Sequence, residues 1–305
     1  MKPPVKDGLL LLDKKPGVTS FDSLANVKRA FATGKAGHTG TLDKFASGLL
    51  LVLVGRGVKL VPLFEDCVKE YTGTVFFGEE TDTLDPEGSV IARGKVPSRE
   101  EVEAVLPAFR GGILQEPPAY SAIHVNGRRA YELIREGKTP EMKKRPVTIF
   151  ELEILSWTPP LAEFRVACSS GTYIRSLARD IALAAGSRAH LASLRRTRIG
   201  GFRLEDAVDS DEANLTEALR PLDRALFQAL SLPCFSIDAE AEEDFIHGKP
   251  LDSILTMGIP PPEVFLSNGR AGVFSKDGTD RFLGFIERRD KRWVYGHVFG
   301  RAEVD

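Results

Sequence analysis

The segment Leu49–Val54 constrains the fold most, because six consecutive apolar residues directly follow a polar, glycine-spaced stretch. A short apolar run of this kind indicates a buried strand. The preceding stretch, residues 36–48, contains only one acid, Asp43. Polar loops held on a rigid scaffold often carry chemistry. Any catalytic interpretation must therefore make Asp43 the reactive group and find its partners elsewhere in the chain.

The length and composition indicate an ordinary globular protein. With 305 residues we expect one large and one smaller domain, and a hydrophobic share of 42% allows a normal core. No apolar run approaches the roughly 18 to 20 residues that span a bilayer. The start, Met1–Pro4, has no signal-peptide segment, so we expect a cytoplasmic protein without membrane contact.

Charge and cysteine usage exclude several classes of protein. The net charge of -2 argues against a generic polyanion binder, although it permits a local basic face. Cys67, Cys168 and Cys234 form no Cys-x-x-Cys pair, so neither a disulfide framework nor a thiolate zinc site is indicated.

Strands and helices are mixed without a regular βαβ alternation, which predicts an α+β fold. The expected strands are residues 9–12, 49–54, 71–77, 147–155 and 164–168. Helices are expected after caps at Thr19 or Ser20, at Ser98 and at Thr172. The first should bury Phe21, Leu24, Val27 and Phe31, and the last should bury Ile174, Leu177, Ala178 and Ile181.

The C-terminal third has a different pattern. Residues 209–230 are predicted to be helical, and residues 231–233 form a linker. Short strands at 271–275, 282–287 and 293–299, separated by Gly and Asp, then predict a small barrel-like module.

The motifs of four common kinds of site are absent from the sequence. Ala36 follows Gly34-Lys35, and Arg29 stands where a P-loop needs its first glycine; Gly55-Arg56-Gly57 lacks the third glycine of a dinucleotide site. No His-x-Glu with a Cys-x-x-Cys supports zinc deamination, and no Gly-x-Ser-x-Gly supports a serine hydrolase.

Arg175 is the best partner for Asp43. It falls in the first turn of the helix predicted after Thr172, where a cation opposes the helix dipole. An Arg–carboxylate pair would offset that cost and would keep the acid ionised and oriented. From spacing alone, a surface arginine is an equally good interpretation.

Six separated segments of the chain carry a family resemblance, in this order: Gly37–Asp43 with Ala46 and Gly48, Lys69–Tyr71, Thr81–Asp85, Gln115–Ala122, Gly171–Leu177 and Leu194–Thr197. In these segments, and over essentially the whole chain, the sequence resembles the bacterial TruB family of tRNA pseudouridine synthases. The C-terminal strands resemble a PUA domain, a small RNA-binding barrel. Two positions depart from the pattern: Lys44 stands where proline is usual, and His124 follows Tyr-Ser-Ala where x-Lys is usual.

The resemblance implies a catalytic domain at residues 1–230, with a mixed, mainly antiparallel sheet flanked by helices, and a PUA-like domain at 233–305. It implies isomerisation of uridine 55 in the T loop of tRNA to pseudouridine, without metal or cofactor. Asp43 would act as nucleophile or general base, and both remain open. Arg175 would pair with it, and Tyr71 would stack on the flipped uracil.

The family also implies a set of RNA contacts. His38 matches the residue that fills the space left by the flipped base, and Tyr173 and Leu194 match residues lining the pocket. Further contacts to the RNA are expected from Thr39, Thr41, Lys14, Lys59 and Arg196. The partner would be the tRNA T stem-loop, and nothing demands more than a monomer. The alternative is a tRNA-binding or RNA-folding protein that has lost catalysis. The reason to consider it is Lys44, which stands beside Asp43 where proline is usual.

Overall fold

A ten-stranded sheet organises most of the chain. The structure is a computed structural model that describes residues 7–300 except 122, 126, 139–140, 211–214, 257–268 and 291. The strands of this sheet are β1 (Gly8–Lys14), β2 (Ala36–His38), β3 (Ser47–Val54), β4 (Lys69–Phe77), β7 (Gly111–Gln115), β10 (Arg145–Thr158), β11 (Leu161–Cys168), β12 (Ala189–Ile199), β13 (Phe202–Arg203) and β14 (Val208–Asp209).

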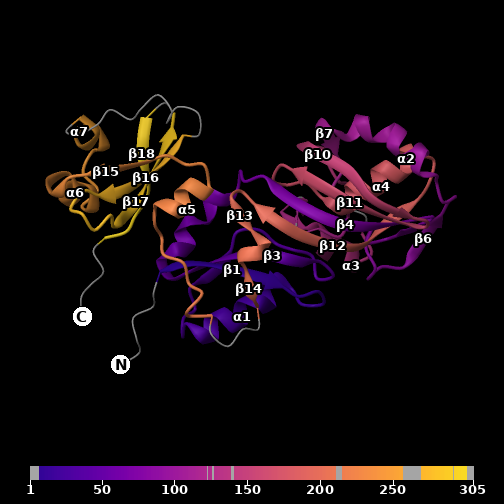
Figure 1. Cartoon of the computed structure of the whole chain (residues 1–305), viewed down its shortest axis with the longest axis horizontal. Helices are drawn as coiled ribbons and strands as arrows, with labels where there is room; N and C mark the ends of the chain where they lie inside the picture. Colours follow the sequence, from indigo (N-terminus) through magenta and orange to yellow (C-terminus); the bar gives the residue numbers. More distant parts are fainter. Residues whose placement is uncertain are drawn as a thin grey trace.

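The sheet is mixed and mainly antiparallel, as predicted. Its order is β14-β1-β3-β12-β4-β11-β10-β7, with β2 on β3 and β13 on β12 (Figure 1). The pairs β1/β14 and β3/β12 are parallel, and the others are antiparallel. At the centre, Arg196 of β12 is in register with Gly48 of β3 on one side and with Tyr71 of β4 on the other. The sheet therefore brings residues from three distant segments to one point.

Helix α1 (Ser20–Ala30) begins where the sequence predicted. Thr19 is its N-cap, in a capping box with Asp22, and Leu24 and Val27 are buried. The prediction that Phe21 faces inward is wrong, because this side chain is 70% exposed. Ser20 takes the inward place, since its hydroxyl binds both backbone groups of Leu42.

Helix α4 (Ile174–Ala184) buries Ile174, Leu177, Ala178 and Ile181, as predicted. The prediction that Thr172 caps it is wrong, because Tyr173 is the N-cap and makes no side-chain cap. The hydroxyl of Thr172 donates instead to the carbonyl of Ser169, at 2.9 Å. The side-chain amide of Gln115 holds the backbone of Tyr173, accepting from its N–H at 2.8 Å and donating to its carbonyl at 3.1 Å.

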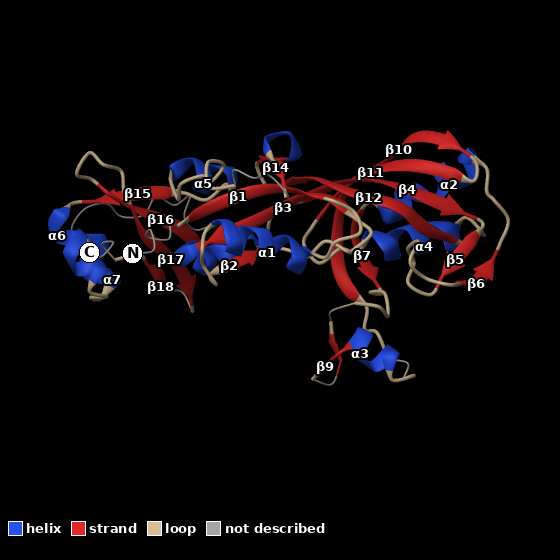
Figure 2. Ribbon diagram, turned by 90° about the horizontal axis from the view of Figure 1, so that it is seen from below, coloured by secondary structure: helices blue, strands red, loops and turns tan. Residues whose placement is uncertain are grey.

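Smaller elements connect the strands of the sheet. They are η1 (Gly55–Phe64), β5 (Glu79–Thr81), β6 (Val90–Arg93), α2 (Arg99–Val105), η2 (Leu106–Phe109), β8 (His124–Val125), β9 (Arg128–Arg129), α3 (Ala130–Arg135) and η3 (Leu204–Asp206). The capping box predicted at Ser98 is present at the start of α2. Figure 2 shows β9 and α3 extending away from the body of the molecule.

The prediction that residues 209–230 are helical is wrong for most of the segment. Residues 211–214 lie outside the described residues, residues 215–218 form turns, and only α5 (Arg224–Ala229) is helical. The segment makes contacts with the sheet that helical spacing does not reveal: β14 pairs with β1, and Arg220 bridges to Leu9.

A second sheet forms the C-terminal part of the chain, as predicted. Strands β15 (Cys234–Ile237), β16 (Arg270–Ser275), β17 (Phe282–Arg289) and β18 (Arg292–Val298) pair in that order, beside helices α6 (Ala239–Ile246) and α7 (Leu251–Thr256). Phe227 of α5 packs against Phe274 and Phe282, so one apolar core joins this sheet to the strands β1 and β3. Closure of the sheet into a barrel and the domain limits stay predictions.

None of the described helices has the length and apolar character needed to cross a membrane.

Candidate active site

The loop that carries Asp43 is held at both ends by the sheet. The stretch 36–48 is not all loop, because β2 occupies its first three residues and β3 begins at Ser47. β2 pairs with the C-terminal end of β3, with His38 opposite Val52. Residues 39–46 therefore form a loop that is anchored in the sheet at both ends. Asp43 lies at a turn in which its carbonyl accepts from the N–H of Ala46, at 3.2 Å.

Buried polar side chains fix the backbone of this loop. Ser20 binds both backbone groups of Leu42, at 2.9 and 3.1 Å. The guanidinium of Arg196 donates to the carbonyls of Gly40 and Leu49, at 3.1 and 2.8 Å. The ammonium of Lys14 donates to the carbonyls of Val18 and Lys44, at 2.7 and 3.4 Å. The position of Asp43 is therefore set by groups on β1, α1 and β12.

These contacts show what Lys14 and Arg196 bind within the protein. Lys14 is fully buried and Arg196 is 1% exposed, and both direct their donors at backbone carbonyls. In the structure both side chains support backbone segments at the site. A contact of either residue with RNA stays a prediction.

Gly48 allows β3 to approach β12 closely. Its φ is +102°, and a Cβ placed there would lie 2.3 Å from the carbonyl oxygen of Arg196 and 2.7 Å from its nitrogen. We expect Gly48→Ala to lower the free energy of unfolding by about 2–4 kcal/mol, because both the φ and the contact are unfavourable. Urea unfolding tests this, with Gly34→Ala as the control because nothing lies within 4 Å of that site. Equal effects of the two substitutions would contradict the expectation.

The burial of Lys14 predicts a dependence of stability on pH. Burial lowers the pKa of Lys14 from 10.5 to about 8. Between these values the unfolded chain binds more protons than the folded one, so the free energy of unfolding rises as pH rises through this window. The gain is about 3 kcal/mol at most.

The test compares urea unfolding near pH 7 and near pH 10 for the wild type, Lys14→Met and Lys15→Met. Lys15 is a suitable control because its side chain is 50% exposed. We expect Lys14→Met alone to lose part of the rise. The same rise in all three proteins would refute the assignment to Lys14.

Asp43 and Arg175 form an ion pair through two contacts. Arg175 Nη2 donates to Asp43 Oδ1 at 3.0 Å, and Arg175 Nε lies 2.9 Å from Asp43 Oδ2. The Arg175 side chain is 5% exposed, whereas that of Asp43 is 36% exposed. The buried guanidinium thus holds a carboxylate that stays accessible, and the pairing predicted from the sequence is present.

Further contacts fix the guanidinium of Arg175. Its Nη1 donates to the carbonyl of Thr83 at 2.8 Å and lies 3.4 Å from Asp85 Oδ2, and its Nη2 donates to the carbonyl of Tyr120 at 3.2 Å. Burial raises the pKa of Asp85, although hydrogen bonds from Thr83 and the charge of Arg175 act in the opposite direction. Arg175 therefore serves two carboxylates, one buried and one open to solvent.

A pocket of about 580 Å³ opens above this pair. It is lined by residues 39–44 of the loop, 120–121, 170–175, Lys69 and Tyr71 of β4, and Leu194 and Arg196 of β12. Eight of the predicted site residues thus line one cavity: Asp43, Arg175, Tyr71, Thr39, Thr41, Tyr173, Leu194 and Arg196.

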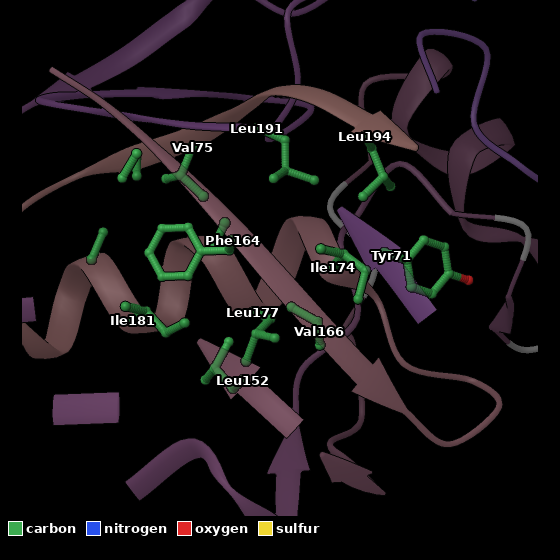
Figure 3. Close-up of a cluster of buried hydrophobic side chains, with 14 of the residues drawn as sticks. Tyr71, Val75, Leu152, Phe164, Val166, Ile174, Leu177, Ile181, Leu191 and Leu194 are labelled. Atoms are coloured by element: carbon green, nitrogen blue, oxygen red, sulfur yellow. The ribbon is translucent and has the colours of Figure 1, made fainter. Parts of the chain in front are cut away.

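Tyr71 joins this pocket to the hydrophobic core. The residue is 8% exposed, and burial raises the pKa of its phenol. Figure 3 shows its ring at the end of an apolar cluster, beside Leu194 and Ile174, with the hydroxyl directed away from the cluster. Tyr71 therefore offers a rigidly packed aromatic ring to the pocket.

Three predicted residues lie outside the pocket lining: Lys14, described above, His38 and Lys59. His38 is on β2, its Nδ1 is buried without a hydrogen-bond partner among the described residues, and burial lowers its pKa. Lys59 is on η1 and is exposed. The side chain of His124 is not among those that the structure describes. Roles of these residues toward RNA stay predictions.

Lys44, the unusual residue beside Asp43, forms an ion pair with Glu87 at 3.3 Å. Its backbone carbonyl accepts from Gly17 at 2.8 Å and from Lys14. The loop is therefore bound on both sides of Asp43 although no proline stiffens it.

Sequence reasoning assigned no role to Lys69, Asp85, Tyr120 or Ser121, which line the pocket or hold Arg175. For Lys69 a signal was available, because residues two apart on a strand share a face and Tyr71 follows it. The others reach the site through contacts across distant segments, which local patterns do not show.

The architecture is the pseudouridine synthase fold. In structure the chain resembles the crystal structure titled a Cbf5-Nop10-Gar1 complex, with a TM-score of 0.69, 24% identity, and coverage of 98% of this chain and 85% of that one. Identity this low shows the shared fold only.

Sequence comparisons then give the family. Residues 28–174 match the N-terminal domain of TruB family pseudouridylate synthases. The chain is 43% identical to the tRNA pseudouridine synthase B of Caulobacter vibrioides, covering 92% of each chain. It is 45% identical to the protein of that name from Dechloromonas aromatica, covering 80% of this chain and 83% of the relative. The chain therefore belongs to the TruB family of pseudouridylate synthases and is an isomerase.

Proposed function

We propose that this protein converts uridine 55 in the T loop of tRNA to pseudouridine, with Asp43 as the essential carboxylate. The observation that carries the proposal is the ion pair between Asp43 and the buried Arg175, in the same pocket as Tyr71. The relatives' name, tRNA pseudouridine synthase B, supports tRNA as the substrate. The matching T-loop position follows from the family resemblance.

The reaction demands little beyond one carboxylate and a shaped pocket. The N1–C1′ bond breaks, the uracil turns, and C5 bonds to C1′ with loss of the C5 proton, while N1 gains a proton. Atoms and oxidation state are conserved, so the proposal requires no metal or cofactor. Asp43 acts on the sugar as a nucleophile or as a general base, and its side chain, which is 36% exposed, is accessible for either role.

Arg175 acts on the carboxylate of Asp43, and Tyr71 acts on the base. An adjacent guanidinium favours the charged form of a carboxylate and fixes its direction. The ring of Tyr71 stacks on the flipped uracil, which contributes about 1–3 kcal/mol and helps offset the cost of unstacking the base. Tyr173 and Leu194 complete the walls around the base, and Thr39 and Thr41 contact the nucleotide from the loop.

The remaining contacts extend beyond the pocket. His38 and Lys59 contact the T loop, and the C-terminal sheet acts as a PUA-like RNA-binding module. We propose that the protein acts as a monomer in the cytoplasm.

The test uses T stem-loop RNA labelled with tritium at C5 of uracil. Isomerisation replaces the C5 hydrogen, so the protein should release tritium to water. The alternative, an RNA-binding protein without catalysis, would bind this RNA and release nothing. That second result would overturn the proposal.

A further inference from the structure

We propose that Lys69 binds a backbone phosphate of the substrate RNA, beside the nucleotide whose base stacks on Tyr71. The inference rests on the proposed function, because it takes the ligand of the pocket to be RNA. It adds an anion subsite to the pocket, formed by the ammonium of Lys69 and the hydroxyl of Ser170.

The position of Lys69 places its ammonium at the pocket. Lys69 and Tyr71 lie two residues apart on β4, and the alternating burial of the strand puts both on the same face. Both line the cavity that contains Asp43. Two residues along a strand span about 7 Å, so one nucleotide reaches both side chains.

Lys69 has fewer partners than a buried ammonium requires. The residue is 8% exposed, and its Nζ donates to the carbonyl of Cys67 at 3.3 Å and to Ser170 Oγ at 3.1 Å. An ammonium has three N–H donors, so one has no acceptor among the described residues. Ser170 is exposed at the mouth of the cavity. A ligand that enters the pocket can therefore reach both groups.

Positive charge exceeds negative charge around the pocket, which favours binding of an anion. Lys14, Lys69, Arg175 and Arg196 are buried cations, whereas the carboxylates of this site are Asp43 and Asp85, and both contact Arg175. Among the described residues, Lys14, Lys69 and Arg196 have no carboxylate oxygen within 4.0 Å. Buried charges without counter-ions are costly. Lys14 and Arg196 donate to backbone carbonyls, so Lys69 is the cation left to meet a ligand.

A phosphate fits this site better than a base does. The carbonyl oxygens of uracil are neutral and would leave the excess charge in place, whereas the phosphodiester is the anionic group of RNA. An exposed hydroxyl beside an ammonium is suited to a tetrahedral oxyanion, which accepts from both.

The experiment measures RNA affinity in an Asp43→Asn background, where substrate is not turned over. We expect Lys69→Met to weaken binding of T stem-loop RNA by about 10- to 100-fold, as loss of a charge-assisted contact does. The slope of log affinity against log salt should fall by about 0.7–0.9. Lys69→Arg should restore part of the affinity. Lys95→Met, which removes an exposed lysine paired with Glu101, is the control and should match the parent.

A second measurement identifies the phosphate and is independent of how the variant folds. RNAs with a neutral methylphosphonate at either linkage flanking the target uridine are bound by the parent and by Lys69→Met. At one linkage, neutralisation should weaken binding by the parent and leave Lys69→Met unchanged. Equal losses in both proteins at both linkages would overturn the inference.

Thermal denaturation of the free protein separates this role from a structural one. If Lys69 mainly supported the fold, Lys69→Met would lower the melting temperature. We expect it unchanged or raised, because an incompletely paired buried charge is removed. Failure here is distinct from failure of the proposed function, because wild-type protein that releases tritium supports the function whatever Lys69 does.

Discussion

Replacement of Asp43 with asparagine is expected to abolish tritium release while leaving RNA binding within a few-fold of the wild type. Asparagine has nearly the same shape but neither a charge nor comparable basicity. Loss of an essential nucleophile or base typically costs about 10⁴-fold or more in rate. The loop should keep its conformation, because Ser20, Lys14 and Arg196 hold its backbone and not the carboxylate.

The matched control for this substitution is Asp66→Asn. Its carboxylate is 90% exposed and lies outside the pocket of Asp43. The rate of tritium release and the affinity for T stem-loop RNA should both be those of the wild type. A rate in Asp43→Asn within about tenfold of the wild type would show that another group carries the chemistry.

The second large effect is expected for Arg175→Met. This change leaves Asp43 and the buried Asp85 without their cation, and breaking a buried pair on one side costs about 3–5 kcal/mol of stability. Activity should fall as well, because Asp43 loses the group that orients it. Urea unfolding and tritium release measure the two consequences separately.

Asp85 gives this variant a characteristic pH dependence. Burial already raises the pKa of Asp85, and loss of the guanidinium removes a factor that lowers it. An acid with a raised pKa in the folded state binds more protons there than in the unfolded chain. The variant should therefore become more stable as pH falls through that raised pKa toward the ordinary value of 3.8. Stability of Arg175→Met that falls with pH as steeply as that of the wild type would contradict this explanation.

Arg179→Met provides the comparison on the same helix. Arg179 lies one turn after Arg175 and binds Asp180 and the carbonyl of Glu116. Its ion pair is partly exposed and does not touch Asp43, so we expect a smaller loss of stability than for Arg175→Met and unchanged tritium release.

The parts of the fold that depend on neighbouring residues were predictable from the sequence. The apolar run that became β3 and the capping boxes of α1 and α2 carry their signals within a few residues. The pairing of Asp43 with Arg175 was reached because a cation in the first turn of a helix needs a partner. Their roles in catalysis stay predictions that the substitutions above test.

The predictions that failed concern residues whose conformation depends on contacts between distant segments. Phe21 turns outward because Ser20 is needed at Leu42, and residues 209–230 are mostly not helical because part of the segment pairs with β1. The burial of Lys14 and Arg196 was not visible in the sequence either, because it depends on how the sheet brings distant strands together beneath the loop. No local pattern distinguishes a buried cation that supports a backbone from an exposed one that binds phosphate.

The most direct test of the account is to map the product on a full tRNA. An unmodified transcript is incubated with the protein, digested with nucleases and analysed by mass spectrometry after labelling of pseudouridine. We expect a single pseudouridine per tRNA, at position 55, and none when position 55 is cytidine. A transcript that is bound but keeps uridine at position 55, or that acquires pseudouridine elsewhere, would contradict the central claim.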